Sequence, residues 1–384
     1  MRPDVDRPEL TFGLARPSRL GALLKRAPRR ALAHFSDLSR VLAFLILRPA
    51  AHLPRRWSLG TADAIGFIYS LTPMGHRIRK SMAIAFPAGD SAKLAHEWMT
   101  RPFRDYVAMR RLIVGRDHVE RFPVESRNEP AILREPGQSL IIAIGHFSRE
   151  ANIGLYKAGL IPKKIFATIA PLDQLSHRPR ALRLRLQITA IMDGIRRARA
   201  GDVDVVPFDG PGALTKLVRH LRQPDSVVTI STDAVSSSGR ERGHVRDFAG
   251  HRSVSFALGT ARLARLSQRP IAVCVPFMDE DGRLVLDWTG PIAAPDRNDE
   301  SADARITSNI LDVLEKAVGM RPGQFVLPLG HERSWDDSTQ RWSPSEALAL
   351  PVGARNLALA DGSRHLQSTM NRLHRDSGHT GPKF

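Results

Sequence analysis

The stretch SLIIAIGHFSREANIGLY, residues 139–156, changes character halfway along its length. Its first half is a short apolar run, which is typical of a buried strand, and its second half is typical of an amphipathic segment. Between the two halves lie His146, Arg149 and Glu150. Because functional side chains in α/β sheets gather where strands end, this corner is the first candidate for a site.

The chain on either side of this stretch alternates between strand and helix patterns. Apolar runs predict strands at 139–147, 163–169, 203–208, 226–234, 271–278 and 283–290. Amphipathic segments predict helices at 180–200, 212–223 and 255–267, and residues 60–120 predict helices alone. Asp281-Gly282, between the last two strand runs, is a strong hairpin signal. This order predicts an α/β fold with a mixed central sheet flanked by helices.

The charge of the chain is strongly basic. Its 384 residues include 57 Lys and Arg against 39 Asp and Glu, a formal net charge of +18. Such a field suggests an anionic partner, which could be nucleic acid, a phospholipid surface or an acidic carrier protein. Aromatic residues make up 6% and do not interleave with basic ones as a base-stacking platform requires, so nucleic acid is not expected. The sequence contains no HExxH spacing, so a metal site is not indicated. Its one cysteine, Cys274, cannot form a disulfide within the chain, which indicates a reducing compartment.

We divide the chain into three parts. Residues 1–60 interleave 12 basic residues with Leu and Phe, which predicts basic amphipathic helices on an anionic membrane surface. The alternative for this region is a helix that packs on the protein's own body with a solvated arginine face. Residues 61–345 form the α/β domain, and the polar tail 346–384 is expected to be poorly ordered. The most apolar run, residues 41–47, is far shorter than the roughly 20 residues of a spanning helix, so none is expected.

The corner at His146 has the residues for proton transfer. A histidine beside a carboxylate can act as a general base, because the carboxylate fixes the tautomer and stabilises the imidazolium that forms. Glu150 would supply the carboxylate, and Ser148 would cap the following helix. Alternatively, Glu150 only favours the start of that helix and His146 only satisfies a loop. A serine hydrolase using Ser148 is a further alternative, but no Gly-x-Ser-x-Gly elbow surrounds it.

Several stretches resemble the bacterial lipid A biosynthesis (lauroyl/myristoyl) acyltransferases, within the lysophospholipid acyltransferase superfamily. They are HRIRKSMAIAFP at 76–87, IIAIGHF at 141–147, LRQPDSVVTISTDA at 221–234, the strand-turn-helix segment at 243–277 and DEDGRLVLDWTGPI at 279–292. The third and fourth are the most specific, with a strand ending in Asp, a Phe-x-Gly turn and a helix containing ARLAR. The resemblance covers roughly residues 40–335 and implies a lysophospholipid-acyltransferase-like fold.

The resemblance also implies an activity. It is the transfer of a fatty acyl group from a thioester of acyl carrier protein or coenzyme A to a hydroxyl or amine of an anionic lipid or glycolipid acceptor. His146 would be the general base, no other cofactor is expected, and the protein would lie peripherally on the cytoplasmic side of the inner membrane. The family motif is His-x4-Asp/Glu, whereas position 151 here is alanine and the acid is Glu150. One residue is about 100° of helical rotation, so the alternative is an inactive relative that binds lipid or a membrane partner.

The resemblance further implies a set of substrate-binding residues. Asp233 matches a family aspartate near the active site, although it could also be a strand-end cap. Arg197 is assigned to a family arginine, in competition with Arg183, Arg185, Arg196 and Arg199. Arginines near the Phe-Ala-Gly turn could hold a phosphate by bidentate hydrogen bonds, or form a solvated basic loop. The full set is Arg149, Arg197, Asp233, Arg240, Arg242 and Arg246.

Overall fold

The computed structural model describes most of residues 38–325 and two short strands at 333–336 and 341–344. Residues 1–37 and 345–384 lie outside the described part, as do short internal segments that include 149–151, 171–178, 199–202, 208–211 and 234–242. The tail 346–384 and most of the basic N-terminal segment are therefore not described, and the three-part division of the chain stays a prediction.

Seven strands form the central sheet, in the order β1-β9-β8-β2-β5-β3-β4. Their bounds are β1 Val124–Arg127, β2 Leu140–Ile144, β3 Ile165–Ala170, β4 Val203–Pro207, β5 Ser226–Ser231, β8 Ile271–Met278 and β9 Leu284–Ile292. Strands β8, β2, β5, β3 and β4 are parallel, β9 is antiparallel to β8, and β1 is parallel to β9. The predicted α/β fold with a mixed sheet is confirmed, and so are all six predicted strands.

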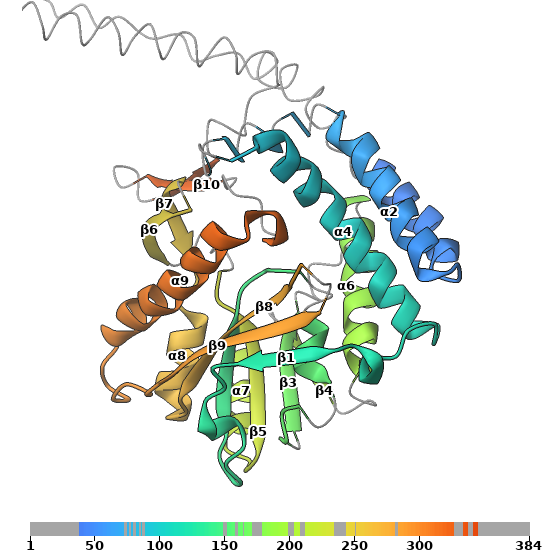
Figure 1. The fold of residues 1–384 in the computed structure, drawn as a ribbon. Helices are drawn as coiled ribbons and strands as arrows, with labels where there is room; N and C mark the ends of the chain where they lie inside the picture. Colours follow the sequence, from blue (N-terminus) through green and yellow to red (C-terminus); the bar gives the residue numbers. More distant parts are fainter. Residues whose placement is uncertain are drawn as a thin grey trace, which may run out of the picture.

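Helices cover both faces of the sheet (Figure 1). One face packs on α7 (Ala213–Leu221), α8 (Gly259–Ser267) and α9 (Ala302–Met320). The other packs on α6 (Pro179–Ala198) and on the C-terminal half of α4 (Ser91–Ile113). Strand β2 is buried along its whole length and sends alternate residues into the two cores. This burial on both faces explains its unbroken apolar sequence.

The predicted helix at 255–267 is wrong at its start. Ser255 and Phe256 end strand β7 (His251–Phe256), which forms an antiparallel hairpin with β6 (His244–Phe248), and helix α8 begins only at Gly259. This hairpin and a second one, β10 (Arg333–Asp336) with β11 (Arg341–Pro344), were not predicted. Short 3-10 helices complete the described elements: η1 Val119–Arg121, η2 Ala131–Leu133, η3 Ile153–Tyr156 and η5 Pro322–Gln324.

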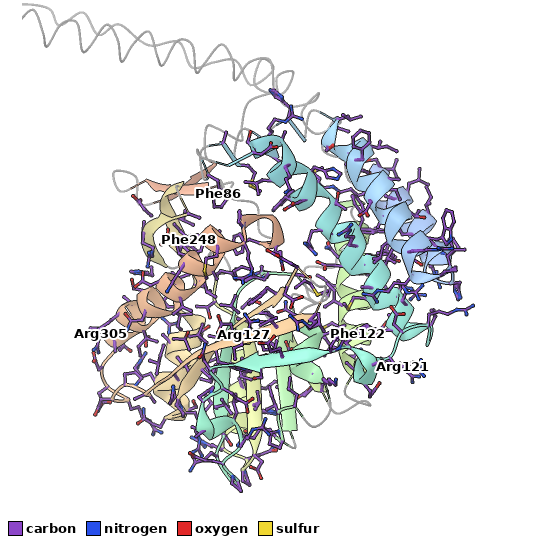
Figure 2. The ribbon with its side chains drawn as sticks, in the orientation of Figure 1. Phe86, Arg121, Phe122, Arg127, Phe248 and Arg305 are labelled. Atoms are coloured by element: carbon purple, nitrogen blue, oxygen red, sulfur yellow. The ribbon has the colours of Figure 1, made fainter. Side chains whose placement is uncertain are left out.

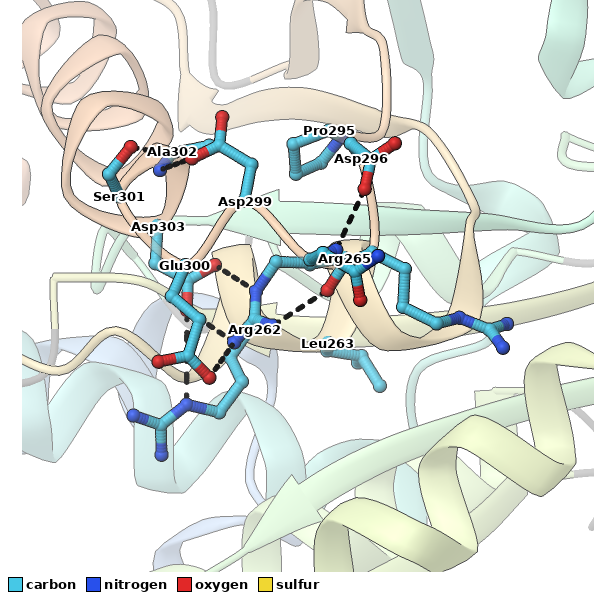
Figure 3. Close-up of polar contacts among 12 residues, drawn as sticks. Arg262, Leu263, Arg265, Pro295, Asp296, Asp299, Glu300, Ser301, Ala302 and Asp303 are labelled. Carbon is cyan, nitrogen blue, oxygen red and sulfur yellow. Dashed lines mark hydrogen bonds and ion pairs between the residues drawn. The ribbon is translucent and has the colours of Figure 1, made fainter.

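A buried ion pair joins α8 to the start of α9. Arg265 donates from Nε and Nη2 to the two carboxylate oxygens of Asp303, at 3.0 and 3.1 Å, and from Nη1 to the carbonyl oxygen of Arg297 (Figure 3). Both charged side chains are almost fully buried. A bidentate pair of this kind fixes the angle between the two helices as well as their distance.

Two further helices, residues 38–50 and α2 (Arg55–Ser70), pack on the outer side of α4 (Figure 1). Phe44 stacks against Tyr106 with ring centroids 4.6 Å apart, and Tyr69 contacts Phe103. Tyr69, near the end of α2, lies close to Ser39, near the start of the first helix, so the two helices are antiparallel. We call residues 38–72 the helical hairpin.

Helix α2 approaches α4 most closely at Gly66. A Cβ atom at Gly66 would lie 2.6 Å from Cα and 2.7 Å from Cβ of Thr100, whereas one at the exposed Gly60 would meet nothing within 4 Å. We expect Gly66→Ala to lower the free energy of unfolding by about 1–3 kcal/mol, because the two backbones must move apart. Gly60→Ala is the matched control and should raise it by up to about 1 kcal/mol. Urea unfolding checks both, and equal effects would contradict this packing.

Arg111, a residue of α4, binds the segment that joins the two helices of the hairpin. Its guanidinium, 5% exposed, donates to Ser58 Oγ at 2.9 Å, to the carbonyl oxygens of Ala51 and Leu53, and to both carboxylate oxygens of Asp117. Asp117 also accepts from Arg55, the first residue of α2, at 2.7 Å. The link is therefore held by one arginine and one aspartate that are both largely buried.

This pair predicts a pH dependence of stability. Burial alone would raise the pKa of Asp117, but the hydrogen bond from Arg111 and the charge of Arg55 outweigh it, so the pKa is lower than usual. A lowered folded-state pKa contributes stability that is present above the unfolded value of about 4 and is lost as the pH falls through the folded value. We expect Asp117→Asn to cost about 1–3 kcal/mol at pH 7, with the difference from wild type shrinking below about pH 4. A pH-independent difference in urea unfolding would refute this.

Candidate active site

The candidate site lies where β2 and β5 end. These adjacent parallel strands pair Ile144 with Ser231, and the ladder runs one residue further through the Thr232 N–H, which donates to the Ile144 carbonyl at 3.0 Å. From β2 the chain crosses to β3 through η3 on the α6 face, whereas from β5 it crosses to β8 through α8 on the opposite face. Connections that leave neighbouring strands on opposite faces open a crevice at the strand ends, which is where ligands bind in sheets of this type.

His146 and Asp233 contact one another at these strand ends. Each lies two residues beyond the end of its strand, His146 after β2 and Asp233 after β5. Asp233 Oδ1 is 2.6 Å from His146 Nδ1, and Asp233 Oδ2 accepts from the His146 backbone N–H at 2.6 Å. Both carboxylate oxygens therefore hold the same histidine, one through its ring and the other through its main chain.

Burial differs sharply between the two side chains. The Asp233 side chain is 0% exposed, whereas that of His146 is 24% exposed. Because an ionised carboxylate only accepts hydrogen bonds, His146 Nδ1 is the donor of this bond. In the neutral imidazole this leaves a lone pair on Nε2, which can accept a proton from a bound substrate.

A threonine pair supports the Asp233 loop. Thr232 Oγ1 lies 3.0 Å from Thr260 Oγ1 in the first turn of α8, and both residues are buried. The strand end that positions Asp233 is therefore tied to the helix of the next crossover. This contact helps to fix the carboxylate before any substrate arrives.

The Ser148 side chain points into the protein, toward helix α4. Its side chain is fully buried and its hydroxyl donates to Asp105 Oδ1 on α4 at 3.3 Å. The Asn152 N–H donates to the Ser148 carbonyl oxygen at 3.0 Å, as in a helical turn, but residues 149–151 lie outside the described part. The N-cap at Ser148 therefore stays a prediction. A hydroxyl buried in this way is poorly placed for nucleophilic attack on a substrate.

The remaining predicted site residues either lie outside the described part of the chain or lie elsewhere in the fold. Arg149, Glu150, Arg240 and Arg242 lie outside the described residues. Arg197 is exposed in the last turn of α6. Because α6 leads into the start of β4, this turn lies toward the edge where the strands begin, away from His146.

Arg246 is engaged with helix α9. Its guanidinium donates to Asp312 Oδ1 and Glu315 Oε2, each at 2.6 Å, and Glu315 Oε1 accepts from the backbone N–H of Ala249. Phe248, which is labelled in Figure 2, lies at the turn of the same hairpin and packs against Phe325. Two carboxylates thus balance the charge of Arg246, and these contacts anchor the β6–β7 hairpin.

The pairing of His146 with Asp233 was not predicted, since Asp233 was assigned to substrate and the carboxylate partner was sought at Glu150. A signal was present in the sequence, because both residues follow apolar strand runs at the same spacing. Within the described residues, no three His, Cys, Asp or Glu side chains converge as a metal site requires. None of the helices in the described part is both long enough and apolar enough to cross a bilayer.

No protein-family model and no curated protein matches this sequence. Among solved structures, the chain is similar to the crystal structure of the 1-acyl-sn-glycerophosphate (LPA) acyltransferase PlsC from Thermotoga maritima, at 13% sequence identity. The match covers 75% of this chain and 100% of that chain, with a TM-score of 0.31. At this score the similarity supports no conclusion about function.

Proposed function

We propose that the protein is an acyltransferase that moves a fatty acyl group from a thioester to a hydroxyl or amine of a lipid acceptor. His146 acts as the general base and Asp233 orients it. The observation that carries this proposal is the pair of 2.6 Å contacts that hold His146 against a fully buried carboxylate at the strand ends. The resemblance of residues 141–147 and 221–234 to lipid A acyltransferases supports the same reaction.

The reaction needs one base that later becomes an acid. His146 Nε2 takes the proton of the acceptor hydroxyl as the oxygen attacks the thioester carbonyl, and the new C–O bond forms. Asp233 stabilises the imidazolium that results. When the tetrahedral intermediate collapses, the C–S bond breaks and the imidazolium returns the proton to the leaving thiolate. The products are an ester and a free thiol, and no group on the protein is acylated.

The charge of the chain favours particular partners. The donors would be acyl carrier protein or coenzyme A, and the acceptor an anionic lipid or glycolipid, because all are negatively charged and the protein carries +18. Ser148 is buried and bonded to Asp105, so the nucleophile would come from the substrate and not from the protein. No metal or further cofactor is needed for this chemistry.

The experiment supplies purified protein with an acyl thioester of each donor and a total bacterial lipid extract. Thiol release is followed and products are identified by mass spectrometry. The proposal expects thiol release that requires the lipid extract, with an acylated lipid whose mass names the acceptor. Thiol release without an acylated lipid would indicate a thioesterase instead, and no turnover by folded protein with either donor would indicate an inactive relative.

A further inference from the structure

Exposed apolar side chains are concentrated on the helical hairpin. Among the described residues, eleven large apolar side chains are exposed, and nine of them lie between residues 38 and 71. The nine are Leu38, Leu42, Leu45, Ile46, Leu53, Trp57, Phe67, Ile68 and Leu71. A concentration of this kind marks an interaction surface, because monomeric proteins rarely expose contiguous apolar area.

The spacing of these residues places them on one face of each helix. In the first helix, the other exposed residues lie four, seven and eight positions after Leu38. Trp57 of α2 is about four helical turns from Leu71, the residue that caps this helix, and Phe67 and Ile68 lie between them. Both helices turn their other face to α4, through Phe44 and Tyr69 among others. The two exposed faces therefore point away from the body of the protein on the same side.

The surface is held firmly before it meets any partner. Arg111 and Asp117 fix the link between the helices, and the Arg104 guanidinium forms a bidentate pair with Asp63 on α2. At the far end of the hairpin, the Tyr69 ring packs against Phe103 of α4, with centroids 5.1 Å apart. A preformed surface loses little conformational entropy on binding.

The net charge of the hairpin is positive. Residues 38–72 contain four arginines and a single acid, Asp63, which is paired with Arg104. Arg48 and Arg56 are exposed on either side of the segment that joins the helices. The Arg56 guanidinium lies 5.7 Å from the centroid of the Trp57 ring, so a cation and an amphipathic aromatic ring occupy the same end. This combination suits the boundary between lipid headgroups and acyl chains.

We infer that this face of the helical hairpin docks on an anionic lipid surface, with its leucines, Phe67 and Trp57 in the outer acyl region and Arg48 and Arg56 among the headgroups. Phospholipid headgroups would supply the negative charge that pairs with Arg48 and Arg56, since the one acid of the hairpin, Asp63, is paired with Arg104. A second copy of the chain is the poorer occupant, because a symmetric dimer would bring the same arginines together without an acid to pair them. Only the consequence for catalysis, access of His146 to a lipid acceptor, rests on the proposed function.

The test is flotation of the full chain with vesicles, measured without a thioester so that its outcome is separate from that of acyl transfer. Vesicles of phosphatidylcholine and phosphatidylglycerol in equal amounts should carry the protein up the gradient. On phosphatidylcholine alone we expect binding about tenfold weaker or more, because the attraction of the two arginines is lost. Leu45→Glu and Phe67→Glu should each weaken binding by about tenfold or more, since a large apolar side chain no longer leaves water.

Matched controls lie elsewhere on the surface. Leu182→Glu on α6 and Met320→Glu on α9 replace apolar side chains of similar exposure and should leave binding unchanged. All four changed positions are exposed, so the variants should fold, which circular dichroism checks. The inference is overturned if wild type binds neither vesicle, or if Leu45→Glu and Phe67→Glu bind as wild type does. A dimer in sedimentation velocity that Phe67→Glu dissociates would also overturn it, by assigning the face to a second copy.

Discussion

Replacing His146 with alanine is expected to lower the rate of acyl transfer by roughly 10²–10⁴-fold, the usual contribution of a positioned general base. The acceptor hydroxyl would then have to lose its proton to water, while binding of donor and acceptor would be little changed. The loss should therefore appear in kcat and much less in KM. Initial rates of thiol release, with saturating donor and with acceptor varied, measure the two separately.

The control for His146→Ala is the folded state. The His146 side chain is partly exposed and its backbone N–H would still donate to Asp233 Oδ2, so the variant should fold. Its unfolding midpoint in urea should fall moderately, because Oδ1 of the buried carboxylate loses its partner. A variant that stays folded and retains wild-type kcat would remove His146 from the mechanism. Vesicle binding, which depends on the helical hairpin, should be unaffected in the same variant.

Replacing Asp233 with asparagine is expected to reduce kcat by up to about 10⁴-fold. The amide has nearly the shape of the carboxylate, but its NH₂ group can donate a hydrogen bond to His146 Nδ1. The ring proton would then move to Nε2, the nitrogen that must accept the substrate proton. Asparagine also lacks the charge that stabilises the imidazolium.

A double variant separates this role from a general loss of structure. If Asp233 acts through His146, Asp233→Asn added to His146→Ala should cost almost nothing further, because residues that act as a unit are not additive. Multiplicative losses in the double variant would instead show that Asp233 contributes independently, as the predicted substrate-binding role would require. The same kcat and KM measurements decide between the two.

The strands were predictable because their sequences are continuous apolar runs, as in β2 and β8. Strand β1 was missed since it is only four residues long, half-buried and mostly polar. The β6–β7 hairpin was missed because β7 runs almost directly into α8, so its last residues read as part of the helical pattern. Length and burial thus decided which elements were visible in the sequence.

The candidate site was predictable only in part. His146 stood out from its place after an apolar strand, but its carboxylate partner was sought within the same corner, at Glu150. The structure brings Asp233 to it from 87 residues away, because β5 inserts between β2 and β3 after three crossovers, through η3, α6 and α7. A strand order of this kind depends on tertiary packing and cannot be inferred from the spacing of residues along the chain.

The arrangement of the helical hairpin was also predictable only in part. The interleaved arginines and leucines of residues 1–60 predicted an amphipathic region, but not which side chains face outward. In the described part, Arg55 and Arg104 are held in ion pairs, while Leu42, Leu45 and Trp57 are exposed. The packing of both helices on α4 decides this exposure. It leaves Arg48 and Arg56 exposed, as the alternative of a packed helix with a solvated arginine face requires, but exposes these apolar side chains as well.

The most direct test of the central claim compares Asp233→Asn and Glu150→Gln with wild type in single-turnover acylation, with the acylated lipid measured by mass spectrometry. If Asp233 is the carboxylate that orients His146, Asp233→Asn should lose nearly all product formation and Glu150→Gln should keep most of it. Full activity in Asp233→Asn together with loss in Glu150→Gln would contradict the account, because the base would then depend on the other carboxylate.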